Sequence, residues 1–203
     1  MTRIEVFADV VCPFTHVGLR RLTEARRGRE SSPAVRVRAW PLEWINGAPL
    51  AAALAAREVD ALREQVAPDL FSGFDAATFP RTSIPAFGLA AAAYAVDDVT
   101  GEVVSLALRD ALFERGQDIS DEDVLQTIAD PFGIELLDRA TTESAVRADR
   151  ERGEARAVQG SPHFFVNDRG WLCPSLDISH EGERFDIQVA DATMRDFYAA
   201  AFS

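Results

Sequence analysis

The residue with the clearest capacity for chemistry is Cys12, which lies between a predicted buried strand at residues 4–8 and a helix that begins at Pro13 and runs to about residue 27. The first turn of a helix carries N–H groups without intrahelical partners and a partial positive charge, both of which stabilise a thiolate. This position predicts a nucleophilic Cys12 with a pKa below that of a free thiol. A buried cysteine that acts only as a small hydrophobic residue is the alternative interpretation.

Two polar residues follow Cys12 in the same predicted helix. His16 comes four residues later and therefore lies on the same helix face, where it would stabilise the thiolate or transfer a proton. A partly exposed histidine without a catalytic role is the alternative. Thr15 either donates a hydrogen bond to the sulfur or is merely packed. Cys12 and His16 also have a metal-ligand spacing, but zinc would need His163 or Cys173 in addition, and we predict no metal site.

A second motif, Gly160-Ser161-Pro162-His163, stands directly before the apolar run of residues 164–166. A proline at the entry of a strand is a place for a cis peptide bond, although an ordinary trans proline also marks strand starts. If this strand pairs antiparallel with the first one, the motif comes to lie beside Cys12. Cys173 then follows two strands away, at about 10 Å between Cα atoms, which exceeds the ~7 Å limit of a disulfide. We therefore expect a structural cysteine there; the alternative, a thiol that resolves the mixed disulfide of Cys12, requires loop motion.

The elements around these motifs predict an α/β fold. Strand, helix and strand at residues 4–8, 13–27 and 35–40 form a βαβ unit. Helices follow at about 50–65, 83–96, 102–115, 120–130 and 142–157, and the chain ends with a hairpin (164–166 and 171–172) and a helix at 191–202. We therefore expect one domain formed by residues 1–48 and 157–203, interrupted by an all-helical insertion at 49–156. Several aromatic residues form either the core of the insertion or a pocket wall for a small apolar electrophile: Phe71, Phe74, Phe79, Phe87 and Tyr94.

The composition excludes several classes of partner and cofactor. The 203 residues carry a net charge of −12, which argues against nucleic acid and anionic membranes as partners. All 21 basic residues are arginine, so Schiff-base chemistry, pyridoxal phosphate linkage and a P-loop are excluded. The sequence shows no signal segment and no apolar stretch long enough to span a bilayer, and it has two cysteines. We expect a soluble protein in the reducing cytoplasm.

The residues 9–18, Asp-Val-Val-Cys-Pro-Phe-Thr-His-Val-Gly, resemble the active-site segment of DsbA-like thioredoxin-fold proteins, especially the FrnE branch with its pattern D-x-x-C-P-W-C-Y-x-G. Gly160-Ser161-Pro162 resembles the cis-proline loop of that family, and Thr82-Ser83 resembles a helix start in its insertion. The resemblance implies a thioredoxin fold with a helical insertion and a thiol–disulfide oxidoreductase. It also implies that Pro13, Phe14, Ser161, Pro162 and His163 surround the bound thiol or substrate.

The chain departs from the family at Thr15, where the second cysteine is expected. A dithiol enzyme resolves its mixed disulfide with that second thiol, and threonine cannot do so. Three functions are consistent with this sequence. Cys12 acts alone with glutathione or mycothiol as co-substrate and no tightly bound cofactor; or the protein is a glutathione-dependent enzyme similar to the 2-hydroxychromene-2-carboxylate isomerases and kappa-class glutathione transferases; or it is a binding module without catalysis. By analogy we also expect a homodimer.

Overall fold

The computed structural model describes residues 2–29, 32–182 and 184–203. A four-stranded sheet forms its centre, with the order β2 (Val35–Ala39), β1 (Ile4–Ala8), β3 (His163–Val166) and β4 (Arg169–Leu172). β1 runs parallel to β2 and antiparallel to β3, so that Val6 pairs with Val37 on one side and with Phe164 on the other. The predicted βαβ unit and the hairpin beside the first strand are both confirmed.

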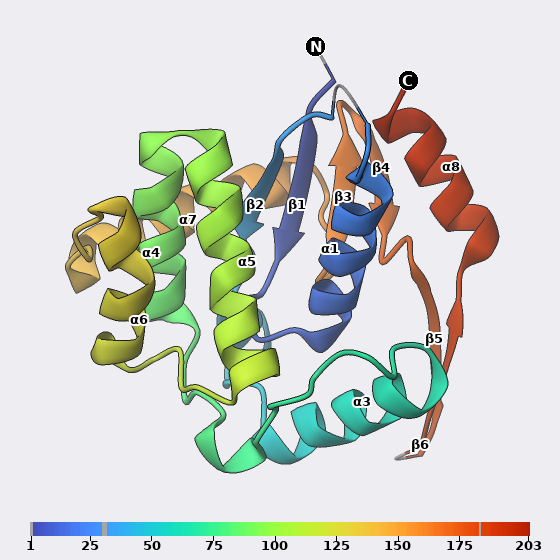
Figure 1. Cartoon of the computed structure of the whole chain (residues 1–203), viewed down its shortest axis with the longest axis horizontal. Coiled ribbons are helices and arrows are strands. Elements are labelled where there is room, and N and C mark those ends of the chain that lie inside the picture. The colour runs from blue at the N-terminus through green and yellow to red at the C-terminus, as the bar shows by residue number, and fades with distance from the viewer. Residues whose placement is uncertain (1, 30–31, 183) are drawn as a thin grey trace.

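Helices cover both faces of this sheet (Figure 1). On one face, α1 (Pro13–Arg26) and α8 (Asp191–Ala201) bury Leu22 and Phe197 against the strand residues Val6 and Phe164. The other face is covered by α7 (Arg139–Ala155), where Gly153 packs against a ring of Trp40. The alternating side chains of β1 therefore serve two separate hydrophobic layers.

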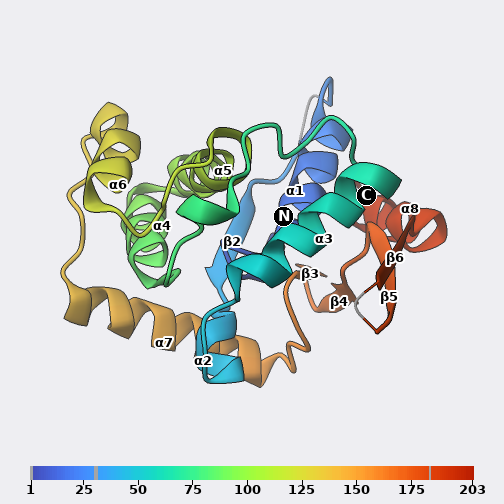
Figure 2. The ribbon, with the colours of Figure 1, turned by 90° about the horizontal axis from the view of Figure 1, so that it is seen from below.

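The chain between β2 and β3 is helical, as expected (Figure 2). Besides α7 it holds α2 (Leu42–Asn46), α3 (Ala52–Gln65), α4 (Ile84–Val96), α5 (Asp98–Arg115) and α6 (Glu122–Ala129), with short 3₁₀ turns at Ala76–Thr78 and Asp130–Phe132. Two helices begin earlier than predicted because aspartates cap them: Asp97 accepts a hydrogen bond from the Thr100 amide at 2.7 Å, and Asp138 accepts one from the Thr141 amide at 2.8 Å. The boundaries at residues 48 and 157 stay predictions.

The insertion covers the free edge of β2. Each outward-facing amide of this strand donates to a side chain of a helix: Val35 to Glu102, Val37 to the Tyr94 hydroxyl and Ala39 to Asp149, at 2.8, 2.8 and 3.0 Å. An edge strand with free amides can pair with another chain. The helices thus satisfy this edge and hold the insertion in a fixed place against the sheet.

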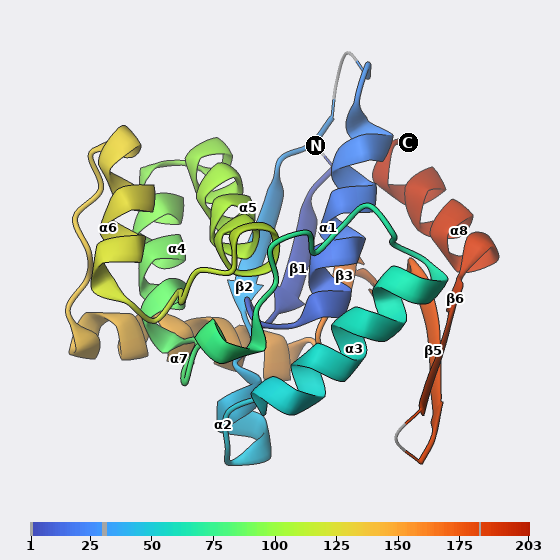
Figure 3. The same cartoon turned by 60° about the horizontal axis from the view of Figure 1, so that its bottom comes forward.

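A second hairpin, β5 (Leu176–Glu181) and β6 (Arg184–Val189), was not predicted from the sequence. Most of its side chains are exposed, so it lacks the apolar pattern of a core strand. The Gln65 side chain at the end of α3 fixes it by donating to the Phe185 carbonyl and accepting from the Ile187 amide. Figure 3 shows this hairpin and α3 beside the beginning of α1.

Most of the aromatic residues singled out in the insertion belong to its core. Phe71, Phe79 and Phe87 are all buried, and Phe74 packs against the same cluster. Phe87 and Tyr94 also line a cavity between β2 and the helices α4, α5 and α7. The core interpretation therefore holds for Phe71, Phe74 and Phe79, whereas Phe87 and Tyr94 form part of a pocket wall. Within the described parts of the chain, the structure has no helix that is long and apolar enough to cross a membrane.

Candidate functional site

Cys12 is the N-cap of α1, as the sequence predicts. Its backbone is extended (φ −81°, ψ 115°), and Pro13 occupies the first helical turn. Cys12 is only 3% exposed, and its thiol donates a hydrogen bond to the carbonyl oxygen of Ser161, with 3.2 Å between sulfur and oxygen. The two sequence motifs, 149 residues apart, therefore meet at a direct contact.

The loop opposite Cys12 is held by polar contacts. The Ser161–Pro162 peptide bond is cis. The Ser161 hydroxyl accepts a hydrogen bond from the Asp9 amide at 2.8 Å and shares another with the Thr15 hydroxyl at 3.1 Å. Thr15 is fully buried. Thr15 thus contributes to the site by fixing Ser161, in the position where the resembling family has its second thiol.

The electrostatics of Cys12 differ from the expectation. Burial raises the pKa of its thiol above its ordinary value, and the charge of Glu58 on α3 adds to this effect. Interactions with Thr15 and Ser161 lower the pKa but do not outweigh burial. The prediction of a pKa below that of a free thiol is therefore wrong, because the helix end was considered without the chain segments that cover the sulfur.

His16 points away from the sulfur and into the insertion. It is 1% exposed, and its Nε2 lies 2.6 Å from Oε1 of Glu114 on α5. Its ring packs against Phe71 and Phe113. Burial lowers the pKa of His16, so we describe the imidazole as neutral, with Nε2–H donating to Glu114. The expectation of a partly exposed His16 is wrong, and the contacts give it a structural role between α1 and α5.

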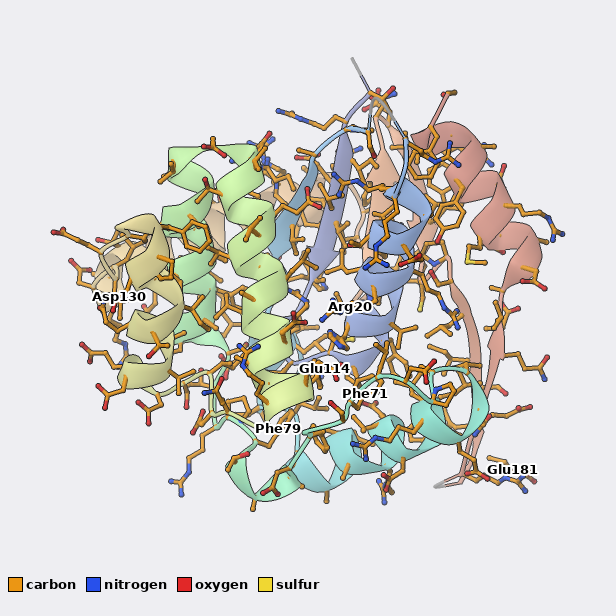
Figure 4. The ribbon with its side chains drawn as sticks, viewed as in Figure 1. Arg20, Phe71, Phe79, Glu114, Asp130 and Glu181 are labelled. Carbon is orange, nitrogen blue, oxygen red and sulfur yellow. The ribbon has the colours of Figure 1, made fainter. Side chains whose placement is uncertain are left out.

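Glu114 is the central residue of a junction formed by α1, α5 and the loop after α3. Besides His16, it accepts hydrogen bonds from the amides of Phe71 and Ser72 at 2.9 and 3.1 Å. These donors lower its pKa to about 2 although partial burial acts in the opposite direction. Figure 4 labels Glu114 at the end of α5 with Phe71 beside it. An ionised carboxylate thus fastens the loop after α3 to both α1 and α5.

The structure brings some of the predicted thiol-binding residues together and leaves one apart. Pro13 is buried beside Cys12, and the Phe14 ring packs against Phe185 of the second hairpin at 6.5 Å between centroids. His163 lies on the sheet face that α7 covers, where its ring stacks on Phe165 and its Nδ1 accepts from the Gln159 amide. Its side chain is therefore separated by the sheet from α1 and from the Cys12 side of the loop.

Cys173 is a free thiol near the same loop. Its amide donates to the Pro162 carbonyl at 2.9 Å, which extends the β3–β4 pairing by one step. Burial raises the pKa of its thiol to about 12, and Cys12 contributes to that rise. Cys12 is also a free thiol, so the two cysteines are not bridged. A resolving role for Cys173 stays untested.

Three charged residues near Cys12 were not predicted as parts of the site. Burial raises the pKa of Asp9 to about 6, while its carboxylate accepts from the Val11 and Leu42 amides. Glu58 has its pKa raised to about 7 by burial. Arg109, which is 1% exposed, donates to the Asp9 carbonyl at 3.3 Å. Asp9 opens the family pattern and could have been found by it; Glu58 and Arg109 come from distant helices and carry no local signal.

No group of three or more metal-ligating side chains occurs within residues 2–29, 32–182 and 184–203. The Cys12 site consists instead of one thiol, the Ser161 carbonyl that accepts from it, and the hydroxyls of Thr15 and Ser161. Such a site can bind a peptide-like or thiol-bearing molecule in the manner of a strand, and it offers one sulfur for exchange with a disulfide.

Comparisons with solved structures place this geometry among known folds. A 2-hydroxychromene-2-carboxylate isomerase matches with a TM-score of 0.63 at 15% identity, covering 83% of this chain and 87% of the other. A putative protein disulfide isomerase from Nitrosomonas europaea gives 0.62 at 11% identity, covering 100% and 99%. The cytosolic disulfide reductase DsbM from Pseudomonas aeruginosa, solved with GSH, gives 0.57 at 14% identity, covering 97% and 98%. At these identities the likeness concerns the fold.

The sequence itself matches a family model over most of its length. No curated protein matches it. The model of the DSBA-like thioredoxin domain matches residues 3–180, which include both motifs and the whole insertion. The chain therefore belongs to the DSBA-like thioredoxin domain family, and its architecture is the thioredoxin fold with a helical insertion.

Proposed function

We propose that this protein is a thiol–disulfide oxidoreductase that works through the single thiol of Cys12 with a small thiol, such as glutathione or mycothiol, as co-substrate. The observation that carries this proposal is the contact of Cys12 with the Ser161 carbonyl, directly before the cis peptide bond of Pro162. The backbone of this loop would align a disulfide partner against the sulfur, as the family resemblance implies. Because Thr15 replaces the second thiol, the release step needs an external thiol or Cys173, and we propose the external thiol.

The proposed exchange has two steps. The Cys12 thiolate attacks the glutathione sulfur of a mixed disulfide, and the other half leaves as a thiolate that takes up a proton. A second glutathione thiolate then attacks the glutathione sulfur bound to Cys12, forming glutathione disulfide and restoring the Cys12 thiolate. The second glutathione supplies the electrons. A compartment that maintains such a thiol pool is reducing, so we propose a cytoplasmic location.

The likeness to DsbM supports a small thiol as partner, since DsbM is a disulfide reductase of this fold whose structure was solved with GSH. The polar groups around Cys12 fit such a partner as well. Ser161 and Thr15 are joined through their hydroxyls and fix the loop in place, so that a bound thiol would meet a preorganised backbone.

One observation favours a second candidate, a glutathione-dependent isomerase or transferase. Cys12 is buried, and its raised pKa keeps it a neutral thiol that donates to Ser161. In that function the sulfur of bound glutathione is the nucleophile, and Cys12 serves as a hydrogen-bonding group beside it. The small apolar electrophile that the sequence left open as a partner would be its substrate.

The two candidates are separated by Cys12→Ser. We measure reduction of a glutathione mixed disulfide by glutathione and by mycothiol, together with the intact mass of the protein after exposure to each oxidised thiol. The first proposal expects that Cys12→Ser abolishes both the adduct and the reduction, while the matched control Cys173→Ser retains both. Retention of activity in Cys12→Ser would refute the single-thiol mechanism and support the isomerase or transferase. Absence of any adduct in the unmodified protein would also count against the single-thiol mechanism.

A further inference from the structure

A cavity of about 300 Å³ lies between the edge strand β2 and the helices α4, α5 and α7. Figures 1 and 2 show these three helices gathered beside β2. Much of the cavity wall is apolar and comes from small or branched side chains, among them Ala86, Ala90, Leu108 and Val146. Cavities of this size and lining are typical of sites for small organic molecules. Cys12, Ser161 and Pro162 do not line it.

One buried cation, Arg109, also lines the cavity. Its Nη1 donates to the carbonyl and the hydroxyl of Ser105 at 2.9 and 2.8 Å, and its Nη2 donates to the Asp9 carbonyl at 3.3 Å. Its Nε has no hydrogen-bond partner in the part of the chain that the structure describes. The acceptors of these hydrogen bonds are two carbonyl oxygens and one hydroxyl, none of which carries a charge. The charges of Asp9 and Asp110 act on Arg109, but neither carboxylate forms a direct ion pair with it. A buried charge without a direct ion pair is costly, and a bound anion would reduce that cost.

Arg109 remains a cation at neutral pH. Burial lowers its pKa to about 10, which is still well above 7. An anion in the cavity would thus meet a full positive charge in a water-poor environment, where a charge-assisted hydrogen bond is stronger than a neutral one.

Other polar groups of the wall already have partners. The Tyr94 hydroxyl donates to the Val35 carbonyl and accepts from the Val37 amide. The Asp149 carboxylate accepts from Arg38 and from the Ala39 amide. Arg36 and Arg38 line the wall as well, but both have carboxylate partners: Arg36 pairs with Asp98, and Arg38 pairs with Glu5 and Asp149. Among the described residues, Arg109 is therefore the arginine of this wall without a direct ion pair.

These features define the ligand by its chemistry. One open cationic donor suits a single carboxylate, and the small apolar side chains suit an apolar body. With about 30 Å³ for each water in the liquid, the cavity has room for on the order of ten non-hydrogen atoms. We propose that this cavity binds a small monocarboxylic acid with an apolar, aromatic or branched body, whose carboxylate pairs with the guanidinium of Arg109.

This site is separate from the thiol chemistry but adjacent to it. The Asp9 carbonyl accepts a hydrogen bond from Arg109 and one from the Cys12 amide at 3.4 Å. The loop of residues 9–12 thus forms the boundary between the cavity and the Cys12 site. A carboxylate at Arg109 and a thiol partner at Cys12 would therefore lie on opposite sides of this loop.

The test uses benzoate as the probe and benzamide as its neutral counterpart of the same shape. Binding to the full chain is measured by titration calorimetry and by the rise in the unfolding temperature, since a ligand that binds only the folded state stabilises it. We expect benzoate to bind at least about tenfold more tightly than benzamide, because only benzoate carries a charge for Arg109. Equal affinity of the two probes would overturn the proposal.

Variants locate the site. Arg109→Met keeps an elongated apolar side chain and removes the charge, and we expect it to weaken benzoate binding about tenfold or more while leaving benzamide unchanged. Ala90→Leu fills the cavity and keeps Arg109, so it should weaken both probes; it also decides the question if Arg109→Met fails to fold. The matched control Arg195→Met removes an exposed arginine from α8 and should bind like the unmodified protein. Undiminished benzoate binding in Ala90→Leu would overturn the proposal, as would chloride or phosphate binding as tightly as benzoate.

Discussion

The junction at Glu114 yields a quantitative prediction about stability. Its carboxylate accepts hydrogen bonds from His16, Phe71 and Ser72, and these donors depress its pKa from an ordinary value of 4.5 to about 2. Each tenfold change in proton affinity corresponds to about 1.4 kcal/mol, so the depression corresponds to about 3 kcal/mol of folding free energy at neutral pH. Glu114 is partly exposed to solvent, which screens its interactions, and we therefore expect about 2 kcal/mol.

The sign of the pH dependence follows from the direction of the pKa. Because the pKa of Glu114 is lower in the folded state, its contribution is fully present above the unfolded pKa of 4.5 and is lost as the pH falls towards about 2. The variant Glu114→Gln removes the charge while retaining the shape. It should unfold with about 2 kcal/mol less free energy than the unmodified protein at pH 7, and this gap should shrink by more than half between pH 5 and pH 3.

Urea unfolding at pH 7, 5 and 3 measures this gap directly. The matched control is Glu143→Gln, which removes a partly exposed carboxylate that pairs with the exposed Arg139 on α7. That variant should show a much smaller loss. Equal stability of Glu114→Gln and the unmodified protein at pH 7, or a gap that stays constant down to pH 3, would refute the reasoning.

Three further predictions concern single positions. Glu58→Gln removes a negative charge that raises the pKa of Cys12, so the midpoint of the Cys12 alkylation rate against pH should fall; an unchanged midpoint would show that the charge does not act on the sulfur. Thr15→Cys restores the two-thiol pattern, and mild oxidation should then form an internal disulfide, seen as the loss of two hydrogens in the intact mass. Gly153→Ala would place a Cβ 2.5 Å from the ring of Trp40, and it should cost about 1–3 kcal/mol of unfolding free energy in a denaturant titration.

The core of the fold could be predicted from the sequence because its signals are local. The strand at residues 4–8 is apolar on nearly every position, and Pro13 marks the first turn of the helix that follows it. The strand at residues 35–39 alternates between buried and half-buried side chains, which gives it the period of two that its pattern shows. In contrast, β5 and β6 bury little more than Leu176 and Ile187, so they leave hardly any periodic signal.

The candidate site was predicted in position but not in its electrostatics. Cys12 and Ser161 could be placed together because a helix start and a strand entry are both readable from residue types, and the antiparallel pairing of β1 with β3 joins them. The pKa of Cys12 depends instead on what covers the sulfur. Burial and the charge of Glu58 come from parts of the chain that no local pattern relates to Cys12.

His16 shows that a local spacing does not reveal a contact with a distant part of the chain. Its spacing of four residues from Cys12 suggested a role at the sulfur, and the helix does place it on the neighbouring turn. Its partner, however, is Glu114, which is 98 residues away in the sequence and belongs to the insertion. A spacing within one helix therefore fixes the direction in which a side chain starts, whereas the second element that packs against the helix decides what this side chain contacts.

The insertion is consequently more than a cover for the thioredoxin domain. Arg109 on α5 donates to the Asp9 carbonyl, which also accepts from the Cys12 amide, and Glu114 on the same helix binds His16 one turn after Cys12. One helix of the insertion thus contacts the segments on both sides of the sulfur. Any displacement of α5 would change the backbone before Cys12 and the helix after it together, so the reactivity of this thiol and the docking of the insertion should vary with each other.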